Sequence, residues 1–142
     1  MGKKPKVKRV VLDTNVILSA LLFKGKLSEI VELWKNRSFI PLISKEIFKE
    51  LQRTLAYSKF HLTKNETHLI INDYILPYFE VVDVAKPFNN VCRDKDDDKF
   101  LSCAISGDSN LIVSGDMDLL SLKSYKNVKI ITPTEFLSIF KK

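Results

Sequence analysis

The segment VVLDTNVILSALL (residues 10–22) places a single acidic residue, Asp13, inside an otherwise apolar run. Burying a lone carboxylate is costly unless the group is paired with a cation or bound to a metal ion. We therefore expect Asp13 to meet partners that come from other parts of the chain.

Two further acids follow a short apolar segment late in the chain. Asp116 comes directly after LIVSG, just as Asp13 comes after VKRVVL (residues 7–12), and both segments have the composition of buried strands. Sites in open α/β sheets form beyond the carboxyl ends of the strands. We expect Asp13 and Asp116 at that edge, with Asp118 two residues further on in the same loop or first helical turn.

The segment RDKDDDKFLSCAI (residues 93–105) supplies a third candidate. A helix is expected from about Asp97 through Ser106, with Gly107 ending it. If this helix turns its apolar side chains toward the core, Asp98 lies near the inward stripe at its start. We select Asp98 for the site. The other acids of the segment are interpreted as solvated or capping groups, which suit a helix N-terminus: Asp94, Asp96 and Asp97.

A glutamate from the segment SKEIFKELQRTL (residues 44–55) is the fourth candidate. Ser44 is a suitable N-cap for the helix that this segment predicts. Glu46 and Glu50 lie four residues apart and share a helix face. We favour Glu50 because an acid in the first helical turn has a local reason to be there, and Glu46 remains the alternative.

Four carboxylates in one cavity need a counter-charge; the four candidates are Asp13, Glu50, Asp98 and Asp116. Two carboxylates about 4 Å apart repel by roughly 4 kcal/mol at an effective dielectric near 20. Neither the two cysteines nor the two histidines have the spacing of a zinc site. Oxygen ligands alone indicate Mg²⁺ or Mn²⁺, as one or two ions. Such an ion polarises a phosphodiester and activates water.

These acids must be positioned by the surrounding fold. Short β-branched segments alternate with amphipathic ones, which predicts one α/β domain over residues 1–142, a three-layer α/β/α sandwich around a central parallel sheet of about five strands. Residues 1–6 are expected to form a basic, flexible tail. Pro41 argues that its strand lies at an edge or that it stands at a strand end. The expected strands are 7–12, 39–44, 80–84, 110–115 and 127–132, and the expected helices are 16–23, 26–36, 45–55, 64–79, 97–106, 116–122 and 133–140.

The charge balance indicates the kind of partner. The 142 residues include 23 basic and 17 acidic ones, a net charge of +6. Basic residues around a local, metal-filled acidic pocket suit a polyanion such as nucleic acid. No apolar stretch reaches the roughly 18 residues that span a bilayer, and the basic N-terminus lacks the cleavage site of a signal peptide. We expect a cytoplasmic protein with no membrane partner.

Four motifs, in this order, resemble the PIN domain, a family of Mg²⁺/Mn²⁺-dependent nucleases that mostly cut single-stranded or structured RNA. The motifs are LDTN after the first strand, the S…KEL helix, DDDKFLSCA and VSGDMDLL. They span residues 12–120, and IITPTEFL near the C-terminus also resembles a common PIN ending. The form most similar to this chain is the toxin component of bacterial and archaeal toxin–antitoxin pairs.

The resemblance implies the strand order 3-2-1-4-5, a frequent homodimer and an antitoxin protein as a possible partner. It also assigns residues: the family's acidic quartet is matched by Asp13, Glu50, Asp98 and Asp116. Asp118 matches an additional acid often seen in the family. Asn15 and Ser114 match polar positions that orient the carboxylates, although the family more often has threonine at position 114.

The resulting hypothesis is a metal-dependent endoribonuclease that hydrolyses RNA with metal-activated water. The direct metal ligands would be Asp13, Asp98 and Asp116. Glu50 and Asp118 would hold a second ion or position metal-bound water, supported by Asn15 and Ser114. Phosphate contacts would come from Lys99, Lys45 and Arg93.

Two alternatives stay open. The first is a catalytically inactive PIN-like module that binds RNA or a protein. The second is a haloacid-dehalogenase-like phosphatase, which needs an acid two residues after its nucleophilic aspartate. This chain has Asn15 at that position.

Overall fold

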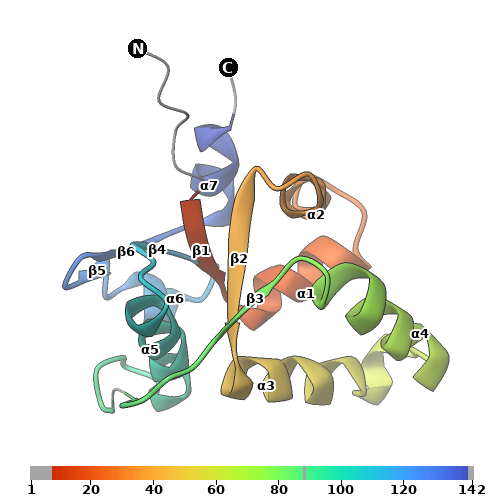
Figure 1. The fold of residues 1–142 in the computed structure, drawn as a ribbon, viewed down its shortest axis with the longest axis horizontal. Helices are drawn as coiled ribbons and strands as arrows, with labels where there is room; N and C mark the ends of the chain where they lie inside the picture. Colours follow the sequence, from red (N-terminus) through yellow and green to blue (C-terminus); the bar gives the residue numbers. More distant parts are fainter. Residues whose placement is uncertain (1–7, 88, 141–142) are drawn as a thin grey trace.

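A computed structural model describes residues 8–87 and 89–140, so the predicted tail at residues 1–6 lies outside the described residues. The fold is a six-stranded sheet flanked by helices, with the strand order β3-β2-β1-β4-β6-β5 (Figure 1). The strands are β1 (Lys8–Leu12), β2 (Phe39–Ser44), β3 (Glu80–Val82), β4 (Leu111–Val113), β5 (Ser124–Tyr125) and β6 (Val128–Ile131).

The five predicted strands correspond to β1, β2, β3, β4 and β6, and their predicted order is confirmed. All four pairings among them are parallel. β5 is an additional two-residue strand that pairs antiparallel with β6 through Tyr125 and Val128. The turn between them contains Lys126 at φ 54° and lacks the Asn-Gly or Asp-Gly pair that announces a tight hairpin in a sequence.

Pro41 does not place β2 at the edge of the sheet, because β2 pairs with β1 on one side and β3 on the other. The ladder with β3 begins only at Leu42, however, so β2 has no paired neighbour on that side at Pro41. A residue without a backbone N–H is tolerated where a strand is locally unpaired.

The helices are α1 (Thr14–Leu22), α2 (Ser28–Lys35), α3 (Lys45–Leu55), α4 (Lys64–Ile70), α5 (Asp98–Ser106), α6 (Met117–Leu120) and α7 (Pro133–Ile139). In Figure 1, α1, α2 and α4 lie on one side of β1 and β2, and α5 and α6 lie on the other. Helix α5 packs against β1, β2 and β4, and α1 packs against α2 and α3. Within the described part of the chain, no helix has both the length and the apolarity to cross a membrane.

The predicted helix over residues 64–79 is divided. The α-helical part ends at Ile70, and Ile71–Ile75 form a π turn in which the amide of Leu76 donates to the carbonyl of Ile71. Pro77 follows directly and supplies no N–H to continue a helix. The indole of Trp34 donates to the carbonyl of Tyr74 at 3.0 Å, which fixes the π turn against α2.

The centre of the sheet is fully apolar up to the point where the site begins. Val10, Val11 and Leu12 of β1 have no exposed surface, and the whole of β4 is buried. Strands buried on both faces read as continuous apolar runs, as these do. The first polar side chains after β1 and β4 are Asp13 and Ser114, and both are buried.

A steric prediction arises at Gly107, which ends α5. A methyl group there would lie 2.7 Å from Leu42 Cδ1, 2.8 Å from Val82 Cγ2 and 3.0 Å from a backbone carbonyl. We expect Gly107→Ala to lower the free energy of unfolding by about 1–3 kcal/mol, as overpacking does. Gly115→Ala is the matched control, because nothing lies within 4 Å of its added Cβ. Thermal unfolding of both variants checks this, and an equal stability for the two would contradict it.

Candidate active site

The register between β1 and β4 brings Asp13 and Asp116 to one edge of the sheet. Val11 pairs with Ile112 and Leu12 with Val113, and the amide of Asp13 donates to the carbonyl of Val113 at 3.0 Å. Chain segments a hundred residues apart therefore leave the sheet side by side, at its carboxyl edge.

Ser114 links the two acids. Its hydroxyl donates to Asp13 Oδ2, and its Oγ accepts the amide of Asp116 at 3.0 Å. Asp13 Oδ1 accepts the amides of Asn15 at 2.7 Å and Val16 at 3.2 Å, so Asp13 is also the N-cap of α1. Asp116 caps α6 in the same way by accepting the amide of Asp118.

Burial raises the pKa of Asp13, and the charge of Asp116 adds to the rise. The hydroxyl of Ser114 and the two capping amides act in the opposite direction, because they stabilise the charged form. Asn15 lines the cleft, and it contacts Asp13 through its backbone amide. Asp13 is thus a buried carboxylate held in one orientation.

Asp97 faces this pair. The residue is 7% exposed, and its Oδ2 is buried without a hydrogen-bond donor. Burial, a hydrogen bond to Asp116 and the charges of Asp116, Asp94 and Asp13 raise its pKa to about 7. A hydrogen bond between two carboxyl groups requires one of them to hold a proton. Without that proton, the arrangement needs a cation in its place.

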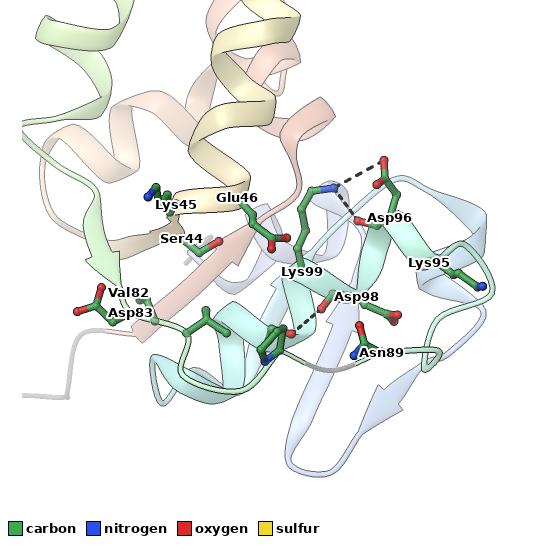
Figure 2. Close-up of a pocket in the computed structure, with 13 residues that line it drawn as sticks. Ser44, Lys45, Glu46, Val82, Asp83, Asn89, Lys95, Asp96, Asp98 and Lys99 are labelled. Carbon is green, nitrogen blue, oxygen red and sulfur yellow. Dashed lines mark hydrogen bonds and ion pairs between the residues drawn. The ribbon is translucent and has the colours of Figure 1, made fainter.

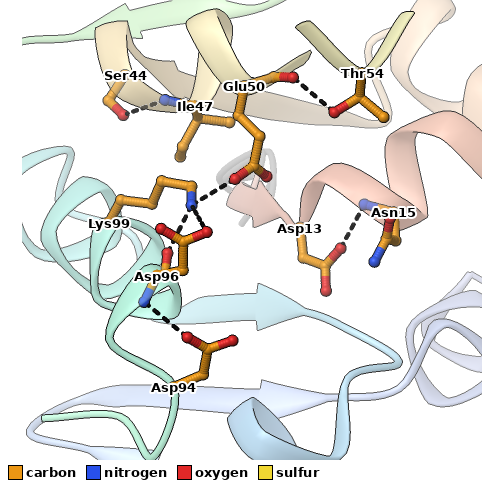
Figure 3. Close-up of polar contacts among 9 residues, drawn as sticks. All are labelled: Asp13, Asn15, Ser44, Ile47, Glu50, Thr54, Asp94, Asp96 and Lys99. Carbon is orange, nitrogen blue, oxygen red and sulfur yellow. Dashed lines mark hydrogen bonds and ion pairs between the residues drawn. The ribbon is translucent and has the colours of Figure 1, made fainter. Parts of the chain in front are cut away.

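Glu50 reaches the same cleft from the middle of α3. Its carboxylate Oε2 lies 2.6 Å from the Lys99 ammonium, which also donates to the carbonyl of Asp96 at 2.6 Å (Figure 3). Glu50 therefore has a fixed internal partner, whereas Asp97 has no ion pair with a basic side chain in the part of the chain that the structure describes.

Together these groups line a cleft of about 180 Å³. Six acids contribute to it: Asp13, Glu50, Asp94, Asp96, Asp97 and Asp116. In residues 8–87 and 89–140, no three acidic, histidine or cysteine side chains stand close enough together to hold a metal ion as they are placed. The donors nevertheless suit a hard divalent cation, since the ionisable groups that could ligate it are all carboxylates and two buried oxygens of the cleft, Asp97 Oδ2 and Thr14 Oγ1, have no hydrogen-bond partner.

Asp98, the acid selected from the sequence, is directed elsewhere. Its Oδ1 accepts the amides of Val91 at 3.2 Å and Cys92 at 2.7 Å, which holds the loop before α5. Asp97 takes the place in the cleft that the sequence analysis gave to Asp98. The physical reason is that successive residues of a helix point about 100° apart, and the loop amides of residues 91 and 92 lie where they satisfy Asp98.

The predicted role of Asp118 as a metal ligand also disagrees with its placement. Its Oδ1 accepts from Arg93 Nε at 2.7 Å, and Asp118 does not line the acidic cleft. The Arg93 side chain is 66% exposed. This ion pair lies on the surface beside the cleft, outside the acidic cluster itself.

A second pocket of about 420 Å³ adjoins the cleft and shares Lys99 and Asp96 with it (Figure 2). Glu46 and Lys45 line this neighbouring pocket, and neither lines the acidic cleft. Of the two glutamates left open by the sequence, Glu50 is therefore the one that the fold brings to Asp13.

The fold is similar to that of two solved structures. One is VapBC2 from Rickettsia felis bound to a DNA fragment from their promoter, with a TM-score of 0.56 and 17% identity over 87% of this chain and 98% of that chain. The other is FitAcB from Neisseria gonorrhoeae, with a TM-score of 0.56 and 19% identity over 88% of this chain and 98% of that chain. At these identities the likeness concerns the fold.

Sequence comparison identifies the family. The uncharacterized protein MJ1680 of Methanocaldococcus jannaschii is 34% identical over 155 aligned positions, which cover 100% of this chain and 98% of that protein. The family model of the PIN domain matches residues 9–118, from β1 to the first turn of α6. That range contains every side chain of the acidic cleft, and the chain belongs to the PIN domain family.

Proposed function

We propose that this protein is a divalent-metal-dependent nuclease that hydrolyses phosphodiester bonds in RNA. The observation that supports this most is the buried Asp97 carboxylate, which lies against Asp116 and near Asp13 with one oxygen lacking any donor. A buried acid in that state costs free energy unless it serves a ligand. The most economical ligand for oxygen donors of like charge is a hard cation.

Asp13, Asp97 and Asp116 would hold the Mg²⁺ or Mn²⁺ ion. When bound, that ion polarises the phosphodiester and makes a nucleophile from water near neutral pH. Asp13 is kept in place by Ser114 and by the amides at the start of α1. Little free energy is therefore needed to orient its carboxylate when the metal ion binds. Asp97 must release its proton before it can contribute a charged oxygen.

Basic side chains around the cleft would receive the RNA backbone. Lys45 is exposed at the start of α3, where it lines the neighbouring pocket, and Arg93 is exposed and pairs with Asp118. With a net charge of +6 concentrated outside the acidic cluster, the surface attracts a polyanion while the acids remain local. We assign Lys45 and Arg93 to phosphate contacts.

We also propose that the protein acts as the toxin of a toxin–antitoxin pair, as a homodimer with an antitoxin protein as its partner. The motif resemblance to PIN toxins supports this assignment, and the fold is similar to that of VapBC2 bound to a DNA fragment and of FitAcB.

The experiment is cleavage of end-labelled single-stranded RNA with Mn²⁺ or Mg²⁺, with and without EDTA. We expect cleavage that EDTA abolishes and that Asp116→Asn lowers on the order of 10²-fold or more, since one metal-binding oxygen charge is lost. Glu32→Gln is the matched control, because Glu32 is an exposed acid on α2, and it should cut like the unmodified protein.

Other outcomes would select other functions. Equal cleavage by Asp116→Asn would identify a contaminating nuclease. Phosphate release from a small monoester would favour the phosphatase. RNA binding without cleavage would favour a non-catalytic module.

A further inference from the structure

Among residues 8–87 and 89–140, Lys99 is the only basic residue that lines the acidic cleft. Its side chain is 10% exposed, and its ammonium lies 2.6 Å from Glu50 Oε2, 2.6 Å from the carbonyl of Asp96 and 3.9 Å from Asp96 Oδ2. The ammonium also lies 5.0 Å from the centroid of the Phe100 ring. Lys99 is thus a largely buried cation with defined partners on several sides.

This position differs from that of the other basic residues near the site. Lys45 is exposed, and Arg93 is 66% exposed and pairs with Asp118 outside the cleft. Figure 3 shows Lys99 extending from α5 toward Glu50 of α3, with Asp13 on the other side of Glu50. Lys99 therefore lies where the acids of the cleft meet those of the neighbouring pocket.

We propose that the Lys99 ammonium takes the place of a second metal ion, so that the site holds one divalent ion on Asp13, Asp97 and Asp116 while the Lys99–Glu50 pair supplies a fixed positive charge. This inference rests on the proposed metal-dependent function and specifies its metal stoichiometry. Lys99 is a positioning residue in this scheme, because it acts on Glu50 and on the charge of the cleft.

The charges and contacts support one ion over two. Glu50 Oε2 already accepts a short, charge-assisted hydrogen bond of 2.6 Å from the Lys99 ammonium. A divalent ion on the same carboxylate would lie within a few ångströms of the ammonium, and like charges that close repel strongly in a buried site. Asp97, by contrast, has one buried oxygen without a hydrogen-bond donor, and its carboxyl group interacts with Asp116 and Asp13.

The test is the number of Mn²⁺ ions bound per chain, measured by titration with detection of free Mn²⁺ by electron paramagnetic resonance. The unmodified protein should bind one ion. Lys99→Met, which keeps the length of the side chain and removes its charge, should bind two, because Glu50 is released. Lys99→Arg should bind one. The double variant Lys99→Met with Glu50→Gln should return to one.

Catalysis gives a second measurement. At one equivalent of Mn²⁺, Lys99→Met should cleave RNA on the order of 10²-fold more slowly than the unmodified protein. Excess Mn²⁺ should restore most of the cleavage rate, and the rate should then depend on the binding of a second Mn²⁺ ion. Lys99→Arg should need no such excess. Circular dichroism of each variant establishes that it is folded.

The outcomes separate this inference from the function on which it rests. Two ions in the unmodified protein, with metal-dependent cleavage intact, would overturn the role of Lys99 and leave the nuclease standing. One ion in a folded Lys99→Met would overturn it as well. No Mn²⁺ binding in any form at millimolar concentrations would overturn the proposed function itself. If Lys99→Met does not fold, the number of Mn²⁺ ions bound by the unmodified protein and by Glu50→Gln decides. One ion in each of these two proteins supports the inference. Two ions in the unmodified protein and one in Glu50→Gln oppose it.

Discussion

Asp97→Asn should lower RNA cleavage on the order of 10³-fold, whereas Asp98→Asn should leave it within about threefold of the unmodified rate. The two residues are neighbours of the same type, and both are buried. Only Asp97 faces Asp116 and Asp13 across the acidic cleft. Loss of a metal-binding carboxylate removes transition-state stabilisation worth several kcal/mol, and a factor of 10³ corresponds to about 4 kcal/mol.

Asp98 should instead affect stability. In Asp98→Asn the side-chain oxygen still accepts the amides of Val91 and Cys92, so we expect a small change in unfolding temperature. In Asp98→Ala the buried amide of Cys92 loses its acceptor, which should cost about 1–3 kcal/mol. Cleavage rates and thermal unfolding of the three variants form one experiment. Loss of cleavage in Asp98→Asn with normal cleavage in Asp97→Asn would reverse the assignment of the site.

Metal binding and folding should both depend on pH through Asp97. Burial and the neighbouring Asp116 raise its pKa from 3.8 to about 7 in the folded protein. Between these values the folded state holds a proton that the unfolded state has released, so the metal-free protein should lose stability as pH rises from about 4 to about 7. The loss should be complete above that range, where Asp97 is charged in both states. We expect a contribution of roughly 1–2 kcal/mol, after allowance for solvent near the cleft.

Metal should reverse this dependence, because an ion binds the charged form of Asp97. Affinity for Mg²⁺ should therefore rise with pH up to about 7, and binding at pH 6 should release about one proton. Calorimetric titration in buffers of different ionisation enthalpy measures the proton release. Thermal unfolding with EDTA from pH 4 to pH 8 measures the stability.

Asp97→Asn should abolish both effects, and Asp98→Asn is the isosteric control that keeps them. The asparagine variant should also be more stable than the unmodified protein at pH 8 without metal, since it removes a charge from beside Asp116. An unchanged pH slope in Asp97→Asn would show that another group titrates in this range.

The sequence predicted those parts of the fold and site that depend on local patterns. Ser44 caps a helix whose bounds, Lys45–Leu55, agree with the expectation, because a cap and an amphipathic repeat are local signals. Asp13 and Asp116 could be placed at one edge of the sheet because Asp13 directly follows one apolar strand and Asp116 comes three residues after the end of another. The order of the five main strands came from the family resemblance and is confirmed.

The choice between Asp97 and Asp98 could not be made in this way. Four aspartates stand in five consecutive positions, and the 3₁₀ turn at Lys95–Asp97 rotates them in a manner that helical periodicity does not give. Which one enters the cleft depends on the loop amides that receive Asp98. The pairing of Asp118 with Arg93 is likewise a contact between segments 25 residues apart.

The hydroxyl bridge of Ser114 to Asp13 has a consequence for the making of this protein. It joins residues 101 positions apart, and the strands that carry them are neighbours at the centre of the sheet. A nascent chain on the ribosome therefore lacks the assembled acids until β4 has emerged and docked beside β1. The proposed nuclease would therefore have no assembled site during translation until the segment that carries Ser114 and Asp116 has left the ribosome.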